Sequence, residues 1–411
     1  MNNVQKLVVA LDFGTEEIEV GELVTADRTV FFRYNADFLK RGLDISPIHL
    51  PIRRLIVQGP PHPFEGLFGV FADSLPDGWG RLLLDRSLIE KGIALQDITP
   101  LDRLAYVGSG GMGALVYKPE VVSSKPNDYY IDLDGLDRAA QQIIVGTASD
   151  IMDQWLHLAG SSGGARPKIL VGYHPVTGNL VPETGILPEG YEHWLIKFPA
   201  ATDRPDIAHV EFAYHQMALD AGLEMSKAQL FKGKSGKHYF GTQRFDREGN
   251  NRLHLHSAAG IMHDNFRLSN MDYGHLMDCA FLLEKDVRAY EKILRIAAFN
   301  VFAHNRDDHS KNFSFLMDRQ GQWKLAPAYD LTFSYSGHGM HSTMVAGESS
   351  RPTRRHLMEL ARHFQVKEAN TVIEAVRDTV QNWPNYAANA GVGQASKNEI
   401  WKAISGMIKE K

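Results

Sequence analysis

FNVFAHNRDDHSKNFSFL, residues 299–316, sets charged and amide side chains between two apolar runs. A solvated loop would scatter such residues, and a helix inside a core would exclude them. Asp307 and Asn312 stand five residues apart, and an apolar strand begins directly behind Asn312. Neither the helical nor the strand period brings two such positions to one face, whereas a short irregular loop lets both side chains face one cavity. The stretch therefore predicts a polar site where a helix gives way to a strand.

Length and composition describe an ordinary soluble globular protein. The chain has 411 residues, which is long for one hydrophobic core, so about two to three domains are expected. Hydrophobic residues make up 44% of the chain and charged residues 23%, as is typical of globular domains. The net charge of −5 argues against wholesale wrapping of nucleic acid but leaves a local basic face open.

Cysteine usage and the N-terminus bear on the cellular compartment. The single cysteine, Cys279, excludes an intramolecular disulfide, and its helical surroundings predict a buried structural thiol and not a nucleophile. The N-terminal MNNVQKLVVALDFGTEE has a short apolar run broken by Asp12 and no small-residue cleavage pattern, so we expect no signal peptide. No apolar run approaches the ~18 residues that span a bilayer. We therefore expect no membrane partner, and cytoplasmic residence follows by default.

The pattern of apolar residues divides the chain into three parts. The first third is rich in strand-forming residues separated by turns, with a helix predicted over residues 76–92 that carries Leu82, Leu83 and Ile89 on one stripe. A polar segment with proline and glycine, residues 123–137, indicates a domain boundary. Helices dominate after about residue 249, except for a predicted hairpin with RQGQ at its turn. The predicted fold class is α+β, with domains at 1–122, 138–248 and 249–411.

Three further pieces carry polar groups that fit the site. AGSSGGARPK, residues 159–168, offers backbone N–H groups and hydroxyls to an anion, although most such clusters are merely turns. Lys197 follows an apolar strand on one face with Leu195, so its ammonium group is either a solvated edge residue or held inward beside an anion. Glu211 on the following helix is one candidate for that anion, and an ordinary surface glutamate is the other interpretation.

The spacing around Asp307 matches the protein-kinase catalytic loop. In that loop an aspartate accepts the proton of the substrate hydroxyl, and an asparagine five residues later binds Mg²⁺. Asp330 ends a short strand some twenty residues downstream, where kinases place a second metal-binding aspartate. Because these motifs occur in this order and at this spacing, together they are stronger evidence for a kinase-like site than any one of them alone.

A hydrolytic metal site is the alternative for the same stretch. His304 and His309 are five residues apart and neighbour Asp307 and Asp308. The sequence has no HExxH motif, no CxxC motif and no second dense histidine cluster with ligand spacing. The histidine pairs at 254 and 256 and at 338 and 341 are expected in loops or on solvated faces. A metallohydrolase is therefore disfavoured.

These motifs resemble the HipA family of serine/threonine kinases, the toxin halves of bacterial toxin–antitoxin pairs, along nearly the whole chain. FEGLFGVFADSLPDGWGRLLLDR and YVGSGGMGALVY are similar to the family's N-terminal part. SSGGARPK, LIKFP, VEFAYHQMALDAGL, RFDR, FNVFAHNRDDHSKNFSFL and APAYDLTFS follow in family order. The resemblance implies a protein-kinase-like core of two lobes, β-rich and then helical, behind a small β-rich accessory domain.

The resemblance implies a role for each matched residue. Asp307 would be the catalytic base, Asn312 and Asp330 would hold Mg²⁺, and Lys197 would bind ATP phosphates and pair with Glu211. Ser161, with Ser162 as its neighbour, matches a loop serine whose autophosphorylation switches the kinase off, because added phosphate brings about −1.5 to −2 charges into the site for ATP phosphates. QRFDR would be the hinge, where the backbone of Gln243 to Phe245 meets adenine and Asp246 approaches the ribose. The residues implied to line the ATP site are Ser161, Ser162, Gly163, Gly164, Ala165, Lys197, Glu211, Gln243, Phe245, Asp246 and His309.

Two departures bear on the substrate. His309 stands where ordinary protein kinases carry a phosphate-contacting lysine, and Lys311 follows two residues later. After RFDR, HLHSAAGIMH replaces an acidic pair expected of the toxin type, and this segment is expected near the wall of the active site. The best-known members modify aminoacyl-tRNA synthetases, which makes such an enzyme one candidate target. The family also implies a small helix-turn-helix antitoxin, with DNA contacted mainly through it.

A rival hypothesis keeps the fold without the catalysis. The chain would then act as a binding module that engages a DNA-bound antitoxin. The basic cluster RPTRRH, residues 351–356, is a candidate contact, and a solvated helix start is its other interpretation. The presence of every expected catalytic residue type weighs against this hypothesis.

Overall fold

The computed structural model describes residues 4–90, 92–121, 131–146, 152–160, 163–183 and 185–409. The chain separates into two compact units. Unit 1 comprises Met1–Asp203, Phe231–His256 and Leu316–Gly321, and unit 2 comprises Arg204–Leu230, Ser257–Phe315 and Gln322–Lys411. Sheets dominate unit 1 and helices dominate unit 2, so the expected α+β class, β-rich first and helical later, is confirmed.

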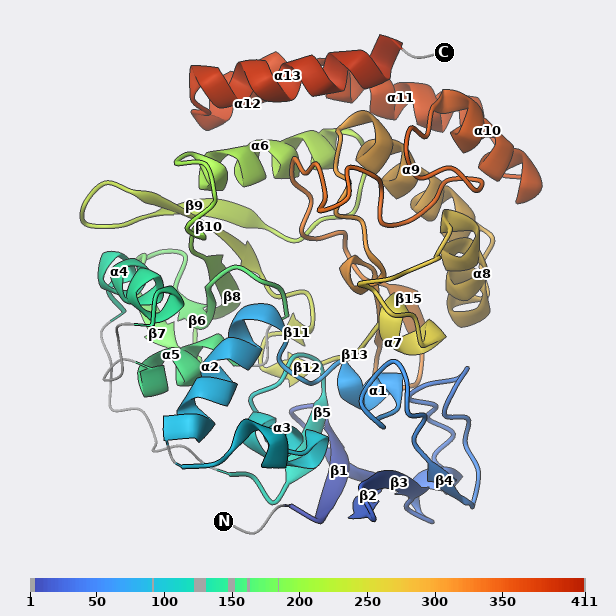
Figure 1. Ribbon diagram of the computed structural model, residues 1–411. Coiled ribbons are helices and arrows are strands. Elements are labelled where there is room, and N and C mark those ends of the chain that lie inside the picture. The colour runs from blue at the N-terminus through green and yellow to red at the C-terminus, as the bar shows by residue number, and fades with distance from the viewer. Residues whose placement is uncertain are drawn as a thin grey trace. The chain divides into compact units, whose positions relative to one another are not determined.

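The first sheet of unit 1 is antiparallel, in the order β4-β3-β2-β1-β5 (Figure 1). Buried residues alternate most clearly along β3, at Val30, Phe32 and Tyr34, because side chains of a strand point to opposite faces in turn. The strands are β1 Lys6–Asp12, β2 Glu17–Ala26, β3 Thr29–Tyr34, β4 Ile56–Gln58 and β5 Leu115–Lys118. The helices and 3-10 turns in this part of the chain are η1 Phe38–Lys40, α1 Gly69–Ala72, α2 Gly78–Glu90, η2 Leu95–Asp97 and α3 Pro100–Val107.

The second sheet of unit 1 has the order β7-β6-β8-β10-β9 (Figure 1). One face packs on α4 and α5 around Trp155, Trp194 and Ile196, which are all buried. The strands are β6 Lys168–Tyr173, β7 Leu180–Pro182, β8 Glu192–Lys197, β9 Ala228–Lys232 and β10 His238–Gln243, and the helices are α4 Leu133–Ile144 and α5 Met152–Ala159. Three short strands follow, β11 Arg247–Glu248, β12 Asn251–Arg252 and β13 His254–Ser257.

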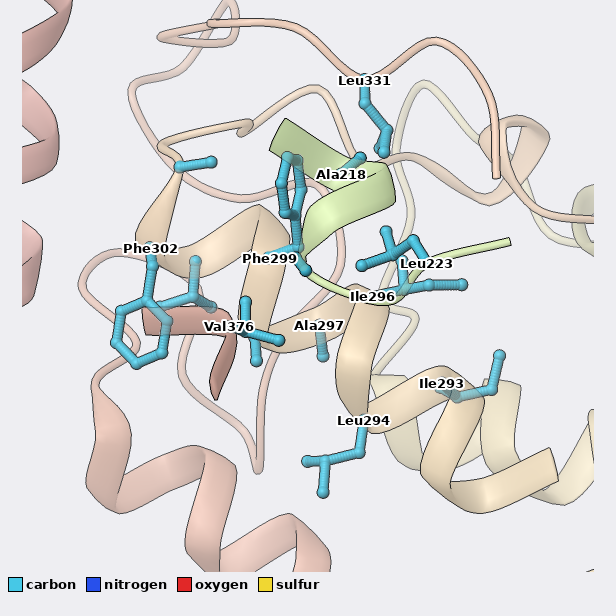
Figure 2. Packing of buried hydrophobic residues seen from close by; sticks show 14 of the residues in the cluster. Ala218, Leu223, Ile293, Leu294, Ile296, Ala297, Phe299, Phe302, Leu331 and Val376 are labelled. Carbon is cyan, nitrogen blue, oxygen red and sulfur yellow. The ribbon is translucent and has the colours of Figure 1, made fainter. Parts of the chain in front are cut away.

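Unit 2 is built around α9, which is buried among the other helices. Figure 2 shows Phe299 and Ala297 of α9 near Ala218 of α6 and Val376 of α11. The helices are α6 Ile207–Asp220, α7 Ala258–Met262, α8 Tyr273–Glu284, α9 Arg288–Phe302, α10 Arg354–His363, α11 Ala369–Gln381, α12 Trp383–Ala390 and α13 Gln394–Lys409. Between α9 and α10 lie η3 Ser310–Asn312, β14 Ser314–Met317 and β15 Trp323–Leu325. The end of α9 is fixed because the buried Tyr214 hydroxyl donates to Ala303 O at 2.6 Å.

Several local predictions are confirmed. The turn after β14 is closed by the Gly321 N–H donating to Asp318 O at 3.0 Å, as RQGQ predicts. Cys279 is buried in α8. The basic cluster at 351–356 contains the start of α10, whose N-cap is Thr353.

None of the helices in the described residues combines the length and the apolar character needed to cross a membrane.

The stripe predicted for the helix at 76–92 is wrong in part. Leu83 is buried as expected, but Ile89 is 51% exposed, and Leu84 and Leu88 are buried instead. The reason is that α2 packs on two sides, with Leu83 in the core of the second sheet and Leu84 and Leu88 in a separate small cluster. The three-domain division of the chain stays a prediction.

The expectation of solvated histidines is confirmed for His338, which is exposed, but is wrong for His254 and His256 in β13, which are fully buried. His254 donates from Nε2 to Ile45 O at 2.9 Å. His256 contacts Asp73 Oδ2 with Nδ1 at 2.6 Å and Ser46 Oγ with Nε2 at 3.0 Å. These side chains are buried because each has partners inside unit 1, which the local sequence does not reveal.

Candidate functional site

The loop between α9 and β14 brings Asp307 and Asn312 together, as their spacing predicts. The Asn312 side-chain amide donates to the Asp307 backbone oxygen at 2.7 Å, and its backbone N–H donates to His309 O at 2.8 Å. The side chain of Asp307 is 57% exposed, and its Oδ1 lies 3.9 Å from Nε2 of His309. The loop thus presents one accessible carboxylate on a backbone closed by its own asparagine.

Asp308 holds this loop from the inside. It is 1% exposed and accepts from the Tyr273 hydroxyl at 2.9 Å, from His341 Nδ1 at 3.0 Å and from the Ser342 N–H at 2.8 Å. The hydroxyl of Thr343 donates to its backbone oxygen at 2.5 Å. The local sequence does not reveal that one of two adjacent aspartates is exposed and the other buried. His341 is buried here, so the expectation of a solvated face is wrong for it.

Amide side chains continue the network behind the loop. Asn305 donates from Nδ2 to Asn300 Oδ1 at 2.9 Å, and Asn300 donates to the Tyr273 hydroxyl at 2.8 Å. Buried polar groups joined in this way fix one arrangement of the backbone. A cavity of about 10 Å³, room for roughly one water molecule, is lined by Asn300, Asn305, Asp308, Asn312 and several apolar side chains from residues 296–331.

The segment that carries Asp330 lies against the same loop. The Tyr329 hydroxyl donates to Lys311 O at 2.6 Å and contacts Ser314 Oγ at 2.7 Å. Asp330 has φ of +57°, in the left-handed region that residues other than glycine seldom adopt. Such strain at a polar residue is typical of functional sites. Asp330 therefore comes directly after Tyr329, whose hydroxyl is hydrogen-bonded to the Asp307–Asn312 loop.

Residues of α7 and the following turn also border the loop. α7 packs against η3, the Ser310 hydroxyl donates to Asp264, and the ring of Phe266 lies 5.4 Å from that of His309 and 4.9 Å from Lys311 Nζ. Helix α7, in the segment after RFDR, thus lies beside the Asp307–Asn312 loop. Asp264 and Phe266 were not singled out from the sequence, because nothing in their local pattern indicates this contact.

The predicted ATP-site residues of unit 1 are partly described. Gly163 and Ala165 are exposed and Gly164 is half-buried with φ of +99°, whereas Ser161 and Ser162 lie outside the described residues. Lys197 ends β8 on the face opposite Ile196, half-buried, with Nζ 5.5 Å from the centre of the Phe240 ring. Glu211 is buried in α6 of unit 2. Its pairing with Lys197 stays a prediction.

The predicted hinge gives Asp246 a structural role. Gln243 ends β10 and is half-buried, as is Phe245, but Asp246 is fully buried. Its carboxylate accepts from Arg244 and Arg247, both at 2.7 Å, and from the Gly113 N–H at 2.6 Å. Burial alone would raise the pKa of Asp246, but the two guanidinium groups lower it well below its usual range. A carboxylate enclosed by these donors holds two segments of unit 1 together, and its approach to a ribose stays a prediction.

Comparison with known families settles the kinship of the chain. Residues 160–383 match the family model of the HipA-like C-terminal domain, and residues 11–118 match that of the HipA N-terminal domain. The chain belongs to the HipA family. The resemblance noted from its motifs is therefore confirmed.

Solved structures and a curated relative agree with this assignment. The HipA structure from the Shewanella oneidensis MR-1 complex of HipA, HipB and operator DNA superposes with a TM-score of 0.67 at 17% identity, over 98% of this chain and 95% of that one. This HipA-family chain thus has the HipA fold. The protein named "Putative kinase Y4mE" from Sinorhizobium fredii (strain NBRC 101917 / NGR234) is 25% identical over 217 residues, 48% of this chain. The match spans about half the length of that relative, 47%.

A second solved structure is much less similar to this chain. The Helicobacter pylori proinflammatory kinase CtkA superposes with a TM-score of 0.38 at 12% identity, over 53% of this chain and 86% of that one.

Proposed function

We propose that this HipA-family chain is an ATP- and Mg²⁺-dependent kinase that phosphorylates serine or threonine side chains of a protein. The observation that carries the proposal is the Asp307–Asn312 loop, in which Asn312 holds the backbone of Asp307 while the carboxylate of Asp307 stays exposed. Phosphoryl transfer needs little covalent chemistry from the protein, so a positioned base and positioned charges are the parts to look for.

Asp307 is proposed as the base. It would orient the substrate hydroxyl and accept its proton while the hydroxyl oxygen bonds to the γ-phosphorus of ATP and the bond to the bridging oxygen of ADP breaks. Exposure suits Asp307 to this role, because a protein substrate must reach it. Asp308 cannot exchange roles with it, since its carboxylate is enclosed by donors of unit 2.

Asn312 and Asp330 fit a magnesium site. The nitrogen of the Asn312 side chain donates to the loop, which leaves its oxygen as the atom suited to a metal. Mg²⁺ prefers oxygen ligands and is commonly held by one or two carboxylates together with substrate phosphates, so a dense ligand cluster is not required. The ion would neutralise charge that develops on the transferred phosphoryl group.

The residues implied by the family are proposed to bind ATP. Gly163, Gly164 and Ala165 would lie along the phosphates, Lys197 would add positive charge with Glu211 orienting it, and His309 would contact the nucleotide. Backbone at Gln243 and Phe245 would meet the adenine. Self-phosphorylation at Ser161 or Ser162 is proposed to switch the enzyme off.

Partners are proposed from the family. The solved Shewanella complex contains HipA, HipB and operator DNA. This supports a small helix-turn-helix antitoxin as partner, with DNA contacted mainly through it. An aminoacyl-tRNA synthetase is the proposed class of protein target, and the cytoplasm the proposed location.

Intact mass before and after incubation with Mg-ATP tests the proposal. We expect the wild-type chain to gain one phosphate, mapped to Ser161 or Ser162, and the D307A variant to gain none while it still binds nucleotide. Asp378→Ala is a matched control, because its aspartate is exposed on helix α11 and not part of the Asp307–Asn312 loop. EDTA should abolish the gain in every sample. A phosphorylated D307A variant would remove the base assignment, and no phosphate in any sample would favour the binding module.

A further inference from the structure

The backbone of Gly164 is held by the turn that starts α2. The Gly164 N–H donates to the Asp77 carboxylate, and the Trp79 N–H donates to Gly164 O at 3.0 Å. One residue earlier, Gly163 O accepts from Nζ of Lys168, which is 6% exposed. We call residues 77–79 together with Gly163 and Gly164 the glycine clasp. Its two sides are far apart in the sequence, and both belong to unit 1.

The clasp leaves no room for a side chain. Gly78 has φ of +45°, and a Cβ placed on it would lie 2.7 Å from Gly164 C and 2.8 Å from Ala165 Cα, with Gly164 O closer still. Such distances are never tolerated by real Cβ atoms, so backbone must shift if Gly78 is substituted. Glycine is therefore required both for the conformation and for the close approach.

A buried aromatic core supports the clasp. Trp79 is 3% exposed, and its ring meets that of Trp155 edge-on at 5.2 Å. Trp155 lies in α5, just before the glycine segment, and Ile169 of β6, just after it, packs in the same core. The turn is thus anchored to the elements on both sides of the segment that it holds.

We infer that Asp77 is a positioning residue of the nucleotide site, which sets the glycine segment in the conformation that receives ATP phosphates. The inference depends on the proposed function, because it takes residues 163–165 as the phosphate-contacting segment. A segment fixed before the ligand arrives loses less conformational freedom on binding, so the ligand binds more tightly. A charge-assisted hydrogen bond between a carboxylate and a backbone N–H is a strong way to fix it.

A competing interpretation makes Asp77 a stand-in for phosphate that blocks the Gly164 N–H. Two observations favour the positioning role. Gly164 is held at its carbonyl as well as at its N–H, and the backbone of Gly78 packs directly on it. A group that merely occupied the place of a ligand would need only the first of these contacts. The two interpretations predict opposite changes in nucleotide affinity.

The test compares D77A, D77N and G78A with wild type in full-length protein. G92A is the matched control, because Gly92 also has a positive φ, +79°, but its Cβ would meet nothing within 4 Å. We would measure the affinity for the non-hydrolysable analogue Mg-AMPPNP, the KM for ATP, kcat, and hydrogen exchange of a peptide spanning residues 163–168. Circular dichroism would check that each variant is folded.

We expect D77A to bind the analogue about tenfold more weakly, equivalent to about 1.4 kcal/mol. Its KM for ATP should rise by a similar factor with kcat little changed, and its glycine-segment amides should exchange faster. D77N keeps an acceptor oxygen and should stay within about threefold of wild type. G78A should resemble D77A, and G92A should match wild type.

Wild-type affinity and exchange in both D77A and G78A would overturn the inference while leaving the proposed function intact. Tighter binding by D77A or D77N would also overturn it and would make the carboxylate a competitor of phosphate. A wild-type chain that binds no nucleotide would overturn the proposed function itself, and the inference with it.

Discussion

Replacing Asp308 by alanine removes a carboxylate that is 1% exposed and that several buried donors share. Asp308 lies within the loop that carries Asp307 and Asn312, so its loss bears on both the stability of unit 2 and the geometry of this loop. The donors to its carboxylate are the Tyr273 hydroxyl, His341 Nδ1 and the backbone N–H groups of Ser342 and Thr343.

The magnitude follows from the groups left behind. A buried donor without an acceptor costs about 1–3 kcal/mol. Removing one partner of a buried charge-assisted contact costs about 3–5 kcal/mol in all, and not the full sum over every donor, because the surroundings relax in part. We expect D308A to lose about 3–5 kcal/mol of the free energy of unfolding of unit 2. For a unit of this size that corresponds to a fall of about 6–20 °C in Tm. Asn keeps one acceptor oxygen, so D308N should lose about 1–2 kcal/mol.

Urea and thermal unfolding of wild type, D308A, D308N and the surface control D378A measure these losses. Two units can unfold separately, so hydrogen exchange of peptides from unit 2 at increasing urea assigns the transition to that unit. Hydrogen exchange of the segment 305–312 should accelerate in D308A before global unfolding. A D308A variant within about 1 kcal/mol of the control would show that the network does not anchor the loop.

Three other properties of the chain can be tested in the same way. Burial lowers the pKa of His254 to about 3 and that of His304 to about 4. Near pH 6.5 these two side chains therefore bind protons in the unfolded chain but stay neutral in the folded chain. The stability contributed by these neutral rings is complete above about pH 6.5 and falls by about 1.4 kcal/mol per group for each pH unit below it. The urea midpoint should therefore drop between about pH 6.5 and 5 and drop less in H254N, and an equal drop in H254N would count against His254. Burial raises the pKa of Cys279 to about 12, so a thiol reagent at neutral pH should label it only as fast as the chain opens, and immediate labelling would contradict this. Trp155 is fully buried with its ring 5.2 Å from that of Trp79, so W155A should cost about 3–5 kcal/mol in chemical denaturation, and a loss under about 1 kcal/mol would be evidence against close packing there.

The order of local motifs along the sequence was enough to predict the α+β class, the HipA resemblance and the irregular loop that joins Asp307 to Asn312. These features depend on residue spacing and on turn chemistry, which act over a few positions of the chain. The hydrogen bond from Asn312 to Asp307 spans five residues. It could therefore be inferred without knowing the rest of the fold.

Only the tertiary structure separated residues that look alike in the sequence. Asp307 and Asp308 are neighbours, yet one side chain is 57% exposed and the other residue 1%. The donors to Asp308 lie 33–35 residues away along the chain. Asp246 and Asp77 likewise owe their roles to partners more than 80 residues distant, Gly113 and Gly164. Burial and hydrogen-bond satisfaction depend on what the fold brings next to a group, and the pattern around that group in the sequence carries no record of it.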